Sequence, residues 1–310
     1  MTRLHAVLGA GGGIGGAIVR TLAAEGRPVR ALARQTLDLP NGVEQRQVDL
    51  RDSTATSEAL DGVAVIYHCA MPAYDRWPQE FPALTRAITE AAARAGADLV
   101  VADNLYAARD NGQPITEADA PVHHGHKART RTAMSEELLA RKDIRVCFGR
   151  GADYYGPGPR GLHSVPGIML FERAAAGKRM LWPGKLDEPH VLHYLPDLAR
   201  ALVMLADSDK AWGRPWNLPS PEPLTGRQYA TAAALGGKVR VTAIPKVAML
   251  AAGIVDVQVR EATETFWQFD RPFLVDASAF EAHIGQLALT SHADGVAQAV
   301  ASARDASGHL

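Results

Sequence analysis

A glycine-rich stretch near the start of the chain constrains the fold more than any other feature. The apolar run 4–8 leads into a cluster of glycines, and an alanine- and leucine-rich run follows through Ala24. That order predicts a strand, a tight turn and a helix, because only glycine fits such a turn without strain. The N–H groups that open the helix carry partial positive charge and suit a pyrophosphate.

Two glycine frames fit this turn. One is GxxGxxG beginning at Gly9, and the other is GxGxxG beginning at Gly11. We prefer the first, because Gly9 directly ends the apolar strand. A dinucleotide is therefore expected to bind here. The residues expected to surround its diphosphate are Gly9, Gly12, Gly13, Ile14 and Gly15.

Strands and helices alternate over the first 150 residues. Apolar runs predict strands at 29–34, 43–48, 63–70, 97–102 and 144–149. A loop is expected at 71–82, and helices are expected at 83–95 and 127–142. This alternation predicts an α/β protein with a Rossmann-type doubly wound parallel sheet.

Beyond residue 160 the alternation weakens. An amphipathic helix at 196–206 and a seventh strand at 215–218 are expected, among shorter elements. We therefore expect a nucleotide-binding domain at 1–152, with returning segments at about 190–218. The remainder, 153–310, would be mainly a smaller, discontinuous α+β lid that binds substrate.

The charge balance is near neutral, which argues against nucleic acid or a membrane surface as a partner. The 310 residues include 33 basic and 34 acidic side chains, for a net charge of −1. No apolar run approaches the length of a membrane span, and strand residues begin by Leu4. A cytoplasmic protein with a small-molecule substrate is the expectation.

Arg34 ends the second predicted strand, where an NAD-preferring site would usually carry Asp or Glu for the ribose 2′-hydroxyl. A guanidinium at this place, with Arg30 nearby, would pair with a 2′-phosphate instead. The sequence therefore favours NADP(H) over NAD(H) as the cofactor. The alternative is a solvated arginine at a strand end.

Several motifs occur together in order along the chain. They are Gly9-x-x-Gly12-x-x-Gly15, Val48-Asp49-Leu50, Ile66 to Ala70, Arg150 to Gly158, His193 to Arg200 and Phe269 to Phe280. With them the chain resembles the extended or atypical branch of the short-chain dehydrogenase/reductases, the NAD(P)-dependent epimerase/dehydratase-like proteins.

The resemblance implies contacts to the cofactor and the substrate. Asp49 would bond the adenine amino group beside Leu50, and Ala70 and Met71 would lie along the cofactor. A substrate cleft would separate the nucleotide domain from the lid, with Tyr74 and Tyr154 at its edge. Family members also suggest a homodimer, paired through the helices at 83–95 and 127–142.

The chain departs from the family at its catalytic residues. The family's chemistry usually rests on a Y-x-x-x-K motif and a Ser or Thr after the fifth strand. The expected lysine is Lys127, which by this resemblance would hold the nicotinamide ribose of the cofactor, but four residues earlier stands His123 rather than tyrosine. The Ser position falls on Asn104, or on Ala102 if the loop is aligned without its short insertion. The family's catalytic triad is thus incomplete.

Three interpretations remain open. Catalysis can persist with a substitute acid, or hydride can pass to an activated double bond that needs no strong acid. Alternatively, the site binds NADP without turnover, as in redox-sensing regulators. The candidates for the substitute acid are Tyr106, His123, His124 and Tyr154.

We expect an NADP(H)-dependent oxidoreductase that acts on a carbonyl or an activated double bond, with Lys127, Asn104, Tyr106 and His123 as catalytic candidates. A non-catalytic NADP-binding regulator is the main alternative. An epimerase or dehydratase with tightly bound NAD is less favoured, because the tyrosine is missing and Arg34 is present.

A metal site is not expected. His123, His124 and His126 lie close together, but a glycine interrupts them and no cysteine or acid stands at ligand spacing beside them. A polar loop that leads into a helix explains these histidines better.

Overall fold

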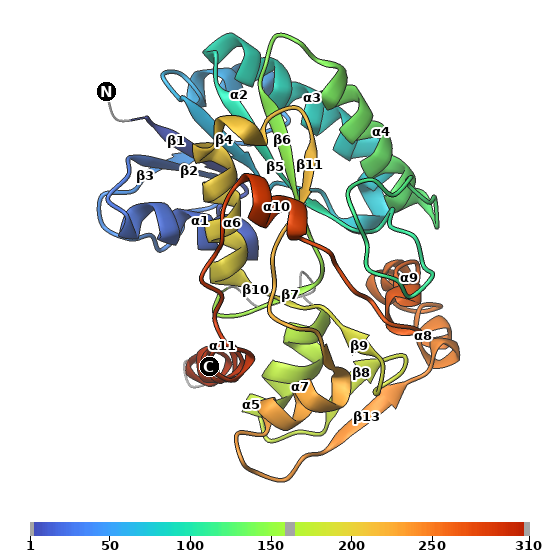
Figure 1. Ribbon diagram of the computed structural model, residues 1–310. Helices are drawn as coiled ribbons and strands as arrows, with labels where there is room; N and C mark the ends of the chain where they lie inside the picture. Colours follow the sequence, from blue (N-terminus) through green and yellow to red (C-terminus); the bar gives the residue numbers. More distant parts are fainter. Residues whose placement is uncertain (1–2, 159–164, 307–310) are drawn as a thin grey trace.

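The computed structural model describes residues 3–158 and 165–306 of the chain. Figure 1 shows a larger lobe, built on the central sheet, and a smaller lobe below it that carries β8, β9, β13 and α7. Some of the segments that join the lobes pass through the region of β7 and β10, between the sheet and the smaller lobe.

Seven strands form the central sheet, in the order β11-β6-β5-β4-β1-β2-β3, and every neighbouring pair is parallel. The chain builds outward from β1 through β2 and β3, then returns beside β1 with β4 and builds the other way. This reversal confirms the doubly wound Rossmann-type sheet, and it lies between β1 and β4, where such sheets bind ligands. The strands are β1 (His5–Leu8), β2 (Val29–Ala33), β3 (Glu44–Gln47), β4 (Val65–His68), β5 (Asp98–Asn104), β6 (Val146–Gly151) and β11 (Pro215–Asn217).

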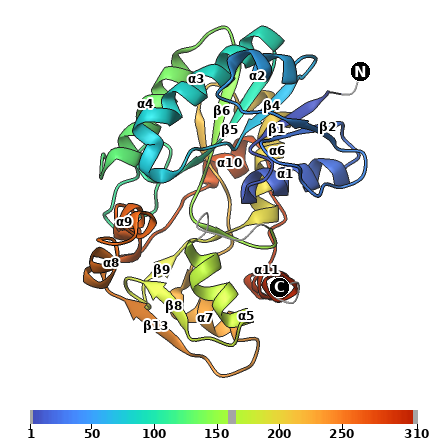
Figure 2. The same cartoon turned by 180° about the vertical axis from the view of Figure 1, so that it is seen from behind.

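Helices cover both faces of this sheet. The helices of the larger lobe are α1 (Gly13–Ala24), α2 (Ser53–Ala59), α3 (Trp77–Ala95), α4 (His126–Ala140) and α6 (Leu195–Asp207). Residues of α1 and α6 form one apolar core with the sheet, and residues of α2, α3 and α4 form the other. Both layers can be followed in Figure 2.

The helix expected to begin at residue 83 begins earlier, at Trp77. A proline fits the first turn of a helix, and Pro78 stands there. Trp77 and Phe81 are fully buried and pack edge to face, with ring centroids 5.0 Å apart. The segment expected to be a loop is therefore partly a wall of the core.

The smaller lobe is a mixture of short strands and helices, as the sequence predicts. Its strands pair as β7 with β10, β8 with β13 and β9 with β12. They are β7 (Tyr154–Tyr155), β8 (Met180–Pro183), β9 (Pro189–His190), β10 (His193–Tyr194), β12 (Leu224–Thr225) and β13 (Val241–Ile244). The later helices are α5 (Arg173–Ala175), α7 (Gly226–Ala233), α8 (Lys246–Ala252), α9 (Val257–Thr263), α10 (Ser278–His283) and α11 (His292–Asp305).

Aromatic side chains form the core of this lobe. The Trp182 ring stacks on Tyr229 and meets Phe269 edge to face. The division of the chain at residue 152 stays a prediction, although α6 and β11 do return to the larger lobe. Among the described residues, no helix is both long and apolar enough to cross a membrane.

Candidate active site

A pocket of about 700 Å³ opens along the carboxyl edge of the central sheet. The segments that follow β1 to β6 all contribute to it. Its walls contain the expected cofactor and substrate residues Gly9, Gly12, Gly13, Ile14, Gly15, Arg34, Asp49, Leu50, Ala70, Met71, Tyr74, Asn104, Tyr106 and Tyr154. The structure thus brings into one pocket residues that are spread over about 145 positions of the sequence.

The glycine turn lines the pocket, and its backbone packs closely against neighbouring backbone. Gly9 has φ +81°, and a Cβ on it would lie 2.8 Å from the backbone of Ala70. A Cβ on Gly15 would lie 2.3 Å from the carbonyl oxygen of Gly9. Both contacts favour the frame that begins at Gly9. Gly12 is the N-cap of α1 and offers no side-chain cap, so the helix amides stay available to an anion and fit a dinucleotide diphosphate.

Two arginines and one aspartate lie at one end of the pocket. Arg51 donates to both carboxylate oxygens of Asp49, with a shortest distance of 2.6 Å, and lowers the pKa of Asp49 to about 2. Arg34 is exposed and lines the same end. Arg30 does not join them. It is buried, and it pairs with Glu44 and donates to the carbonyl of Ala59.

Asn104, Tyr106 and Tyr74 form the opposite end of the pocket. The Tyr106 amide donates to Oδ1 of Asn104 at 3.0 Å, so the side-chain NH₂ of Asn104 remains for another acceptor. The hydroxyls of Tyr74 and Tyr106 share a hydrogen bond of 3.1 Å. Burial raises the pKa of both tyrosines, which therefore hold their protons at neutral pH.

Asp153 follows β6 and lines the same end of the pocket. Burial raises the pKa of its carboxyl to about 6. Burial also raises the pKa of its neighbour Tyr154. Near neutrality Asp153 therefore changes protonation state far more readily than the surrounding phenols.

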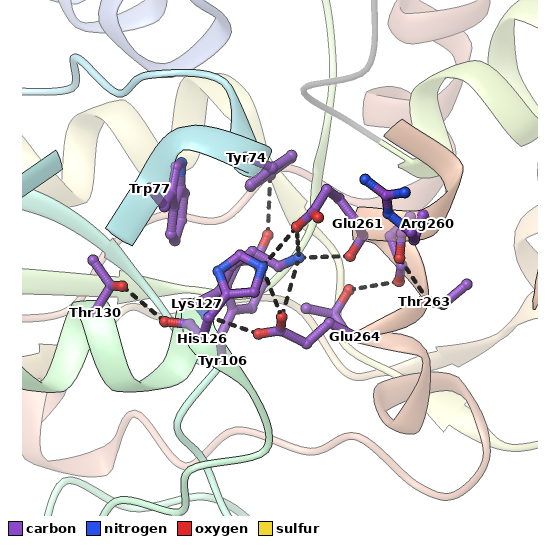
Figure 3. A network of polar contacts seen from close by, with 12 residues as sticks. Tyr74, Trp77, Tyr106, His126, Lys127, Thr130, Arg260, Glu261, Thr263 and Glu264 are labelled. Carbon is purple, nitrogen blue, oxygen red and sulfur yellow. Dashed lines mark hydrogen bonds and ion pairs between the residues drawn. The ribbon is translucent and has the colours of Figure 1, made fainter. Parts of the chain in front are cut away.

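Lys127 does not line this pocket. Its side chain is 2% exposed, and Nζ donates to the backbone oxygen and to Oε2 of Glu261 on α9, at 2.5 and 3.2 Å. Figure 3 shows the side chain of Lys127 beside the carboxylates of Glu261 and Glu264. Nζ also lies 5.2 Å from the ring centroid of Tyr74, which lines the pocket.

Glu264 caps the amino end of α4 from a distant part of the chain. Its Oε1 accepts from the Lys127 amide at 2.8 Å, and its Oε2 lies 3.1 Å from Nε2 of His126. A Cβ on Gly125 would lie 2.2 Å from the Glu264 carboxyl carbon, so the glycine makes room for this cap. The sequence gives no hint of these acids, which lie more than 130 residues away.

His126, Glu261 and Glu264 together have the donor set of a metal site, although no acid stands at ligand spacing beside the histidines in the sequence. However, Lys127 Nζ lies 3.2 and 3.8 Å from the two carboxylates. The ammonium group already supplies the positive charge that a cation would bring. We therefore interpret this cluster as a structural ion network.

The other two histidines lie outside the pocket walls. His123 is exposed on the loop before α4 and is not brought to the pocket. His124 donates from Nε2 to the carbonyl of Ala108 at 2.7 Å and stacks on Trp267 with a centroid distance of 4.2 Å. His123, which stands four residues before Lys127, therefore does not line the pocket.

Sequence reasoning missed Arg131 and gave no role to Asp103 or Asp153, and all three line the pocket. Arg131 lies one helical turn after Lys127, so the helix spacing was available as a signal. The two aspartates stand at the carboxyl ends of β5 and β6, the positions that such sheets use for ligands.

Comparisons with known proteins fit this geometry. The model of the NAD dependent epimerase/dehydratase family matches residues 5–218. A 3-diazoavenalumate denitrifying reductase from Streptomyces sp. is 31% identical over 222 residues, which is 66% of this chain and 72% of that protein. The sterol demethylase protein B of Methylococcus capsulatus is 36% identical over 198 residues, 58% of this chain and 60% of that protein.

Solved structures share the fold. A UDP-glucose 4-epimerase from Thermus thermophilus, solved with NAD, has a TM-score of 0.76 and 21% identity, covering 98% of this chain and 99% of its own. The glycine turn and the doubly wound sheet agree with the family match. The chain belongs to the NAD dependent epimerase/dehydratase family.

Proposed function

We propose that this protein is an NADP(H)-dependent oxidoreductase that transfers hydride to or from a carbonyl or an activated double bond of a small organic molecule. The observation that carries the proposal is one continuous pocket. It runs from the glycine turn and Arg34 to the polar, aromatic end at Asn104 and Tyr106. A dinucleotide and a substrate would thus meet in one enclosure.

The charges at the glycine-turn end support NADP(H). Asp49 is already paired with Arg51, so its carboxylate repels a phosphate less than a free one would. Arg34 adds a second guanidinium beside it. Two arginines against one aspartate favour the additional phosphate of NADP(H).

The polar end supplies groups for the reacting part of a substrate. When bound, the reduced nicotinamide supplies a hydride, that is, one proton and two electrons. The side-chain NH₂ of Asn104 would donate to a substrate oxygen, because the Tyr106 amide already occupies the side-chain oxygen of Asn104. Asp153 would deliver the matching proton, because its pKa of about 6 suits proton transfer near neutrality, and its carboxylate would regain a proton from solvent.

The name of the Streptomyces relative, a reductase, supports reduction as the direction of the reaction. An epimerase or dehydratase that recycles tightly bound NAD fits less well. Neither the tyrosine of the family motif nor an acid at the Arg34 position is present.

A non-catalytic NADP-binding regulator is the second candidate. The observation in its favour is the capture of Lys127 by Glu261 of α9, which withdraws the expected family lysine from the pocket. In this case the polar end would sense the cofactor rather than promote turnover.

Titration of the purified protein with NADPH and NADH tests the proposal. We expect NADPH to bind at least tenfold more tightly, about 1.4 kcal/mol. NADPH consumption is then followed over panels of aldehydes, quinones and enones, with turnover of at least one class expected. Tight NADPH binding with no turnover anywhere favours the regulator, and failure to bind either cofactor refutes both candidates.

A further inference from the structure

Arg131 is a buried cation in the wall of the pocket. It extends from α4, and only 9% of the residue is exposed. Its guanidinium carbon lies 4.9 Å from the Trp77 ring centroid and 4.5 Å from that of Phe81, so two aromatic rings hold the group in place. Among the residues that the structure describes, its Nε has no hydrogen-bond partner.

The carboxylate of Asp103 lies close to two arginines. Asp103 Oδ1 lies 3.5 Å from Nε of Arg131, and its Oδ2 lies 3.5 Å from Nε of Arg150. Both distances exceed the 2.7–2.9 Å or so of a charge-assisted hydrogen bond. The cluster therefore carries one more positive than negative charge, in a place where an uncompensated charge is costly.

We infer that Arg131 anchors a carboxylate group of the substrate at this end of the pocket. A carboxylate would accept hydrogen bonds from the guanidinium and would balance the charge that Asp103 leaves uncompensated. This inference names the substrate class of the proposed function and rests on it.

The surrounding walls indicate an aromatic acid. Tyr74, Trp77 and Tyr106 line the pocket beside Arg131. Aromatic rings attract a flat aromatic ligand by offset or edge-to-face packing. A planar ring with one carboxylate substituent therefore suits this end of the pocket better than a polyhydroxylated sugar.

A phosphate of the cofactor is not the expected partner of Arg131. The diphosphate site is the amino end of α1, which follows β1. Asp103 ends β5, and β4 lies between β5 and β1 in the sheet. Two strand spacings, roughly 10 Å, therefore separate the two positions across the sheet.

The test compares carboxylates with neutral amides of the same shape. Benzoate, cinnamate and 2-naphthoate are titrated, each beside its primary amide, into the protein saturated with NADP⁺, with calorimetry as the readout. We expect at least one acid to bind tenfold or more tightly than its amide. In Arg131→Gln that preference should vanish while the affinity for the amide stays the same.

Arg129→Gln is the matched control, because Arg129 is exposed on the same helix, and it should keep the preference for the acid. The affinity for NADP⁺ is measured in each variant before the acids are added. If wild type binds NADP⁺ but no acid is preferred over its amide, or if Arg131→Gln retains the preference, the carboxylate anchor is refuted and the cofactor proposal stands. If wild type does not bind NADP⁺ at all, the proposed function itself is refuted.

Discussion

The ammonium group of Lys127 donates to Glu261 Oε2 across 3.2 Å, and this contact ties α4 of the larger lobe to α9. Burial lowers the pKa of Lys127, although the two neighbouring carboxylates oppose that shift. A lysine expected to hold a cofactor ribose therefore serves as a structural cation in this conformation. Its contribution to stability can be measured separately from any role in turnover.

Lys127→Met and Glu261→Gln should couple strongly in a double-mutant cycle. The lysine side chain is 2% exposed and that of the glutamate 11%, so removing one partner leaves a buried charge whose remaining neighbour is Glu264 for the lysine or His126 for the glutamate. We expect a coupling free energy of about 1–3 kcal/mol in urea denaturation. Arg86 and Glu137, an exposed pair 3.5 Å apart, are the control and should couple by less than about 1 kcal/mol. Equal coupling in the two cycles would contradict the structural role of Lys127.

The same contact predicts a dependence of stability on pH. Burial alone would raise the pKa of Glu261, but the charge and hydrogen bond of Lys127, with help from His126, lower it overall. A carboxyl whose folded pKa is lowered stabilises the protein above its unfolded value of 4.5, and this stabilisation is lost as the pH falls through the folded pKa. The difference in unfolding free energy between wild type and Glu261→Gln should therefore shrink below about pH 4.5. A constant difference down to lower pH would exclude this linkage.

Arg34→Ala should weaken NADPH binding by tenfold or more and leave NADH binding nearly unchanged, because only NADPH carries the 2′-phosphate. Fluorescence titration of both cofactors measures this, with Arg86→Ala as an exposed control that does not line the pocket. Equal losses for both cofactors would argue against a contact between Arg34 and the phosphate.

Asp153→Asn should abolish a pH dependence of turnover. If Asp153 delivers the proton, reduction needs its protonated form, so kcat/KM in wild type should fall as the pH rises through about 6. The variant should be slow and flat over the same range. Retention of the wild-type profile in Asp153→Asn would assign the titration to another group.

The same raised pKa has a consequence for folding. A carboxyl that binds its proton more tightly when folded makes the protein less stable as the pH rises from the unfolded value of 3.8 to about 6. Asp153→Asn should therefore stabilise the protein above pH 6 by at most about 3 kcal/mol, less where solvent reaches the carboxyl. Thermal unfolding of both proteins at pH 5 and at about pH 8 shows whether the stability gained by Asp153→Asn grows with pH, as expected.

Gly9→Ala and Gly42→Ala form a matched pair. Both glycines have nearly the same backbone angle, φ +81° and +84°, so both substitutions incur roughly 1–2 kcal/mol of strain. A Cβ at Gly42 meets nothing within 4 Å, whereas one at Gly9 lies 2.8 Å from the Ala70 backbone. We expect Gly9→Ala to cost about 1–3 kcal/mol more in unfolding experiments and to weaken cofactor binding. Identical effects at the two sites would mean that the close approach is unimportant.

The local parts of the fold could be read from the sequence. Alternating apolar runs and a strand-turn-helix glycine pattern depend on neighbouring residues, so the sheet and the turn beginning at Gly9 were predicted correctly. The predicted start of α3 is wrong because the prediction places Pro78 in a loop, although a proline fits the first helical turn.

The polar end of the pocket and the ion network around Lys127 are harder to predict from the sequence. Glu261 and Glu264 reach α4 only through tertiary folding, and their spacing from His126 carries no periodic signal. His123 follows a family position in the sequence, yet its loop carries it to the surface. The pairing of Arg131 with Asp103 likewise joins two elements whose distance depends on how α4 packs on the sheet.

The position of β11 has a consequence for how the chain is made. This strand pairs with β6 at the edge of the central sheet, but its Pro215 lies 67 residues after its partner Phe148 in the sequence. During synthesis the edge of β6 stays uncovered until much of the smaller lobe has left the ribosome. A nascent or truncated chain that ends near residue 152 would expose that edge to other strands and aggregate.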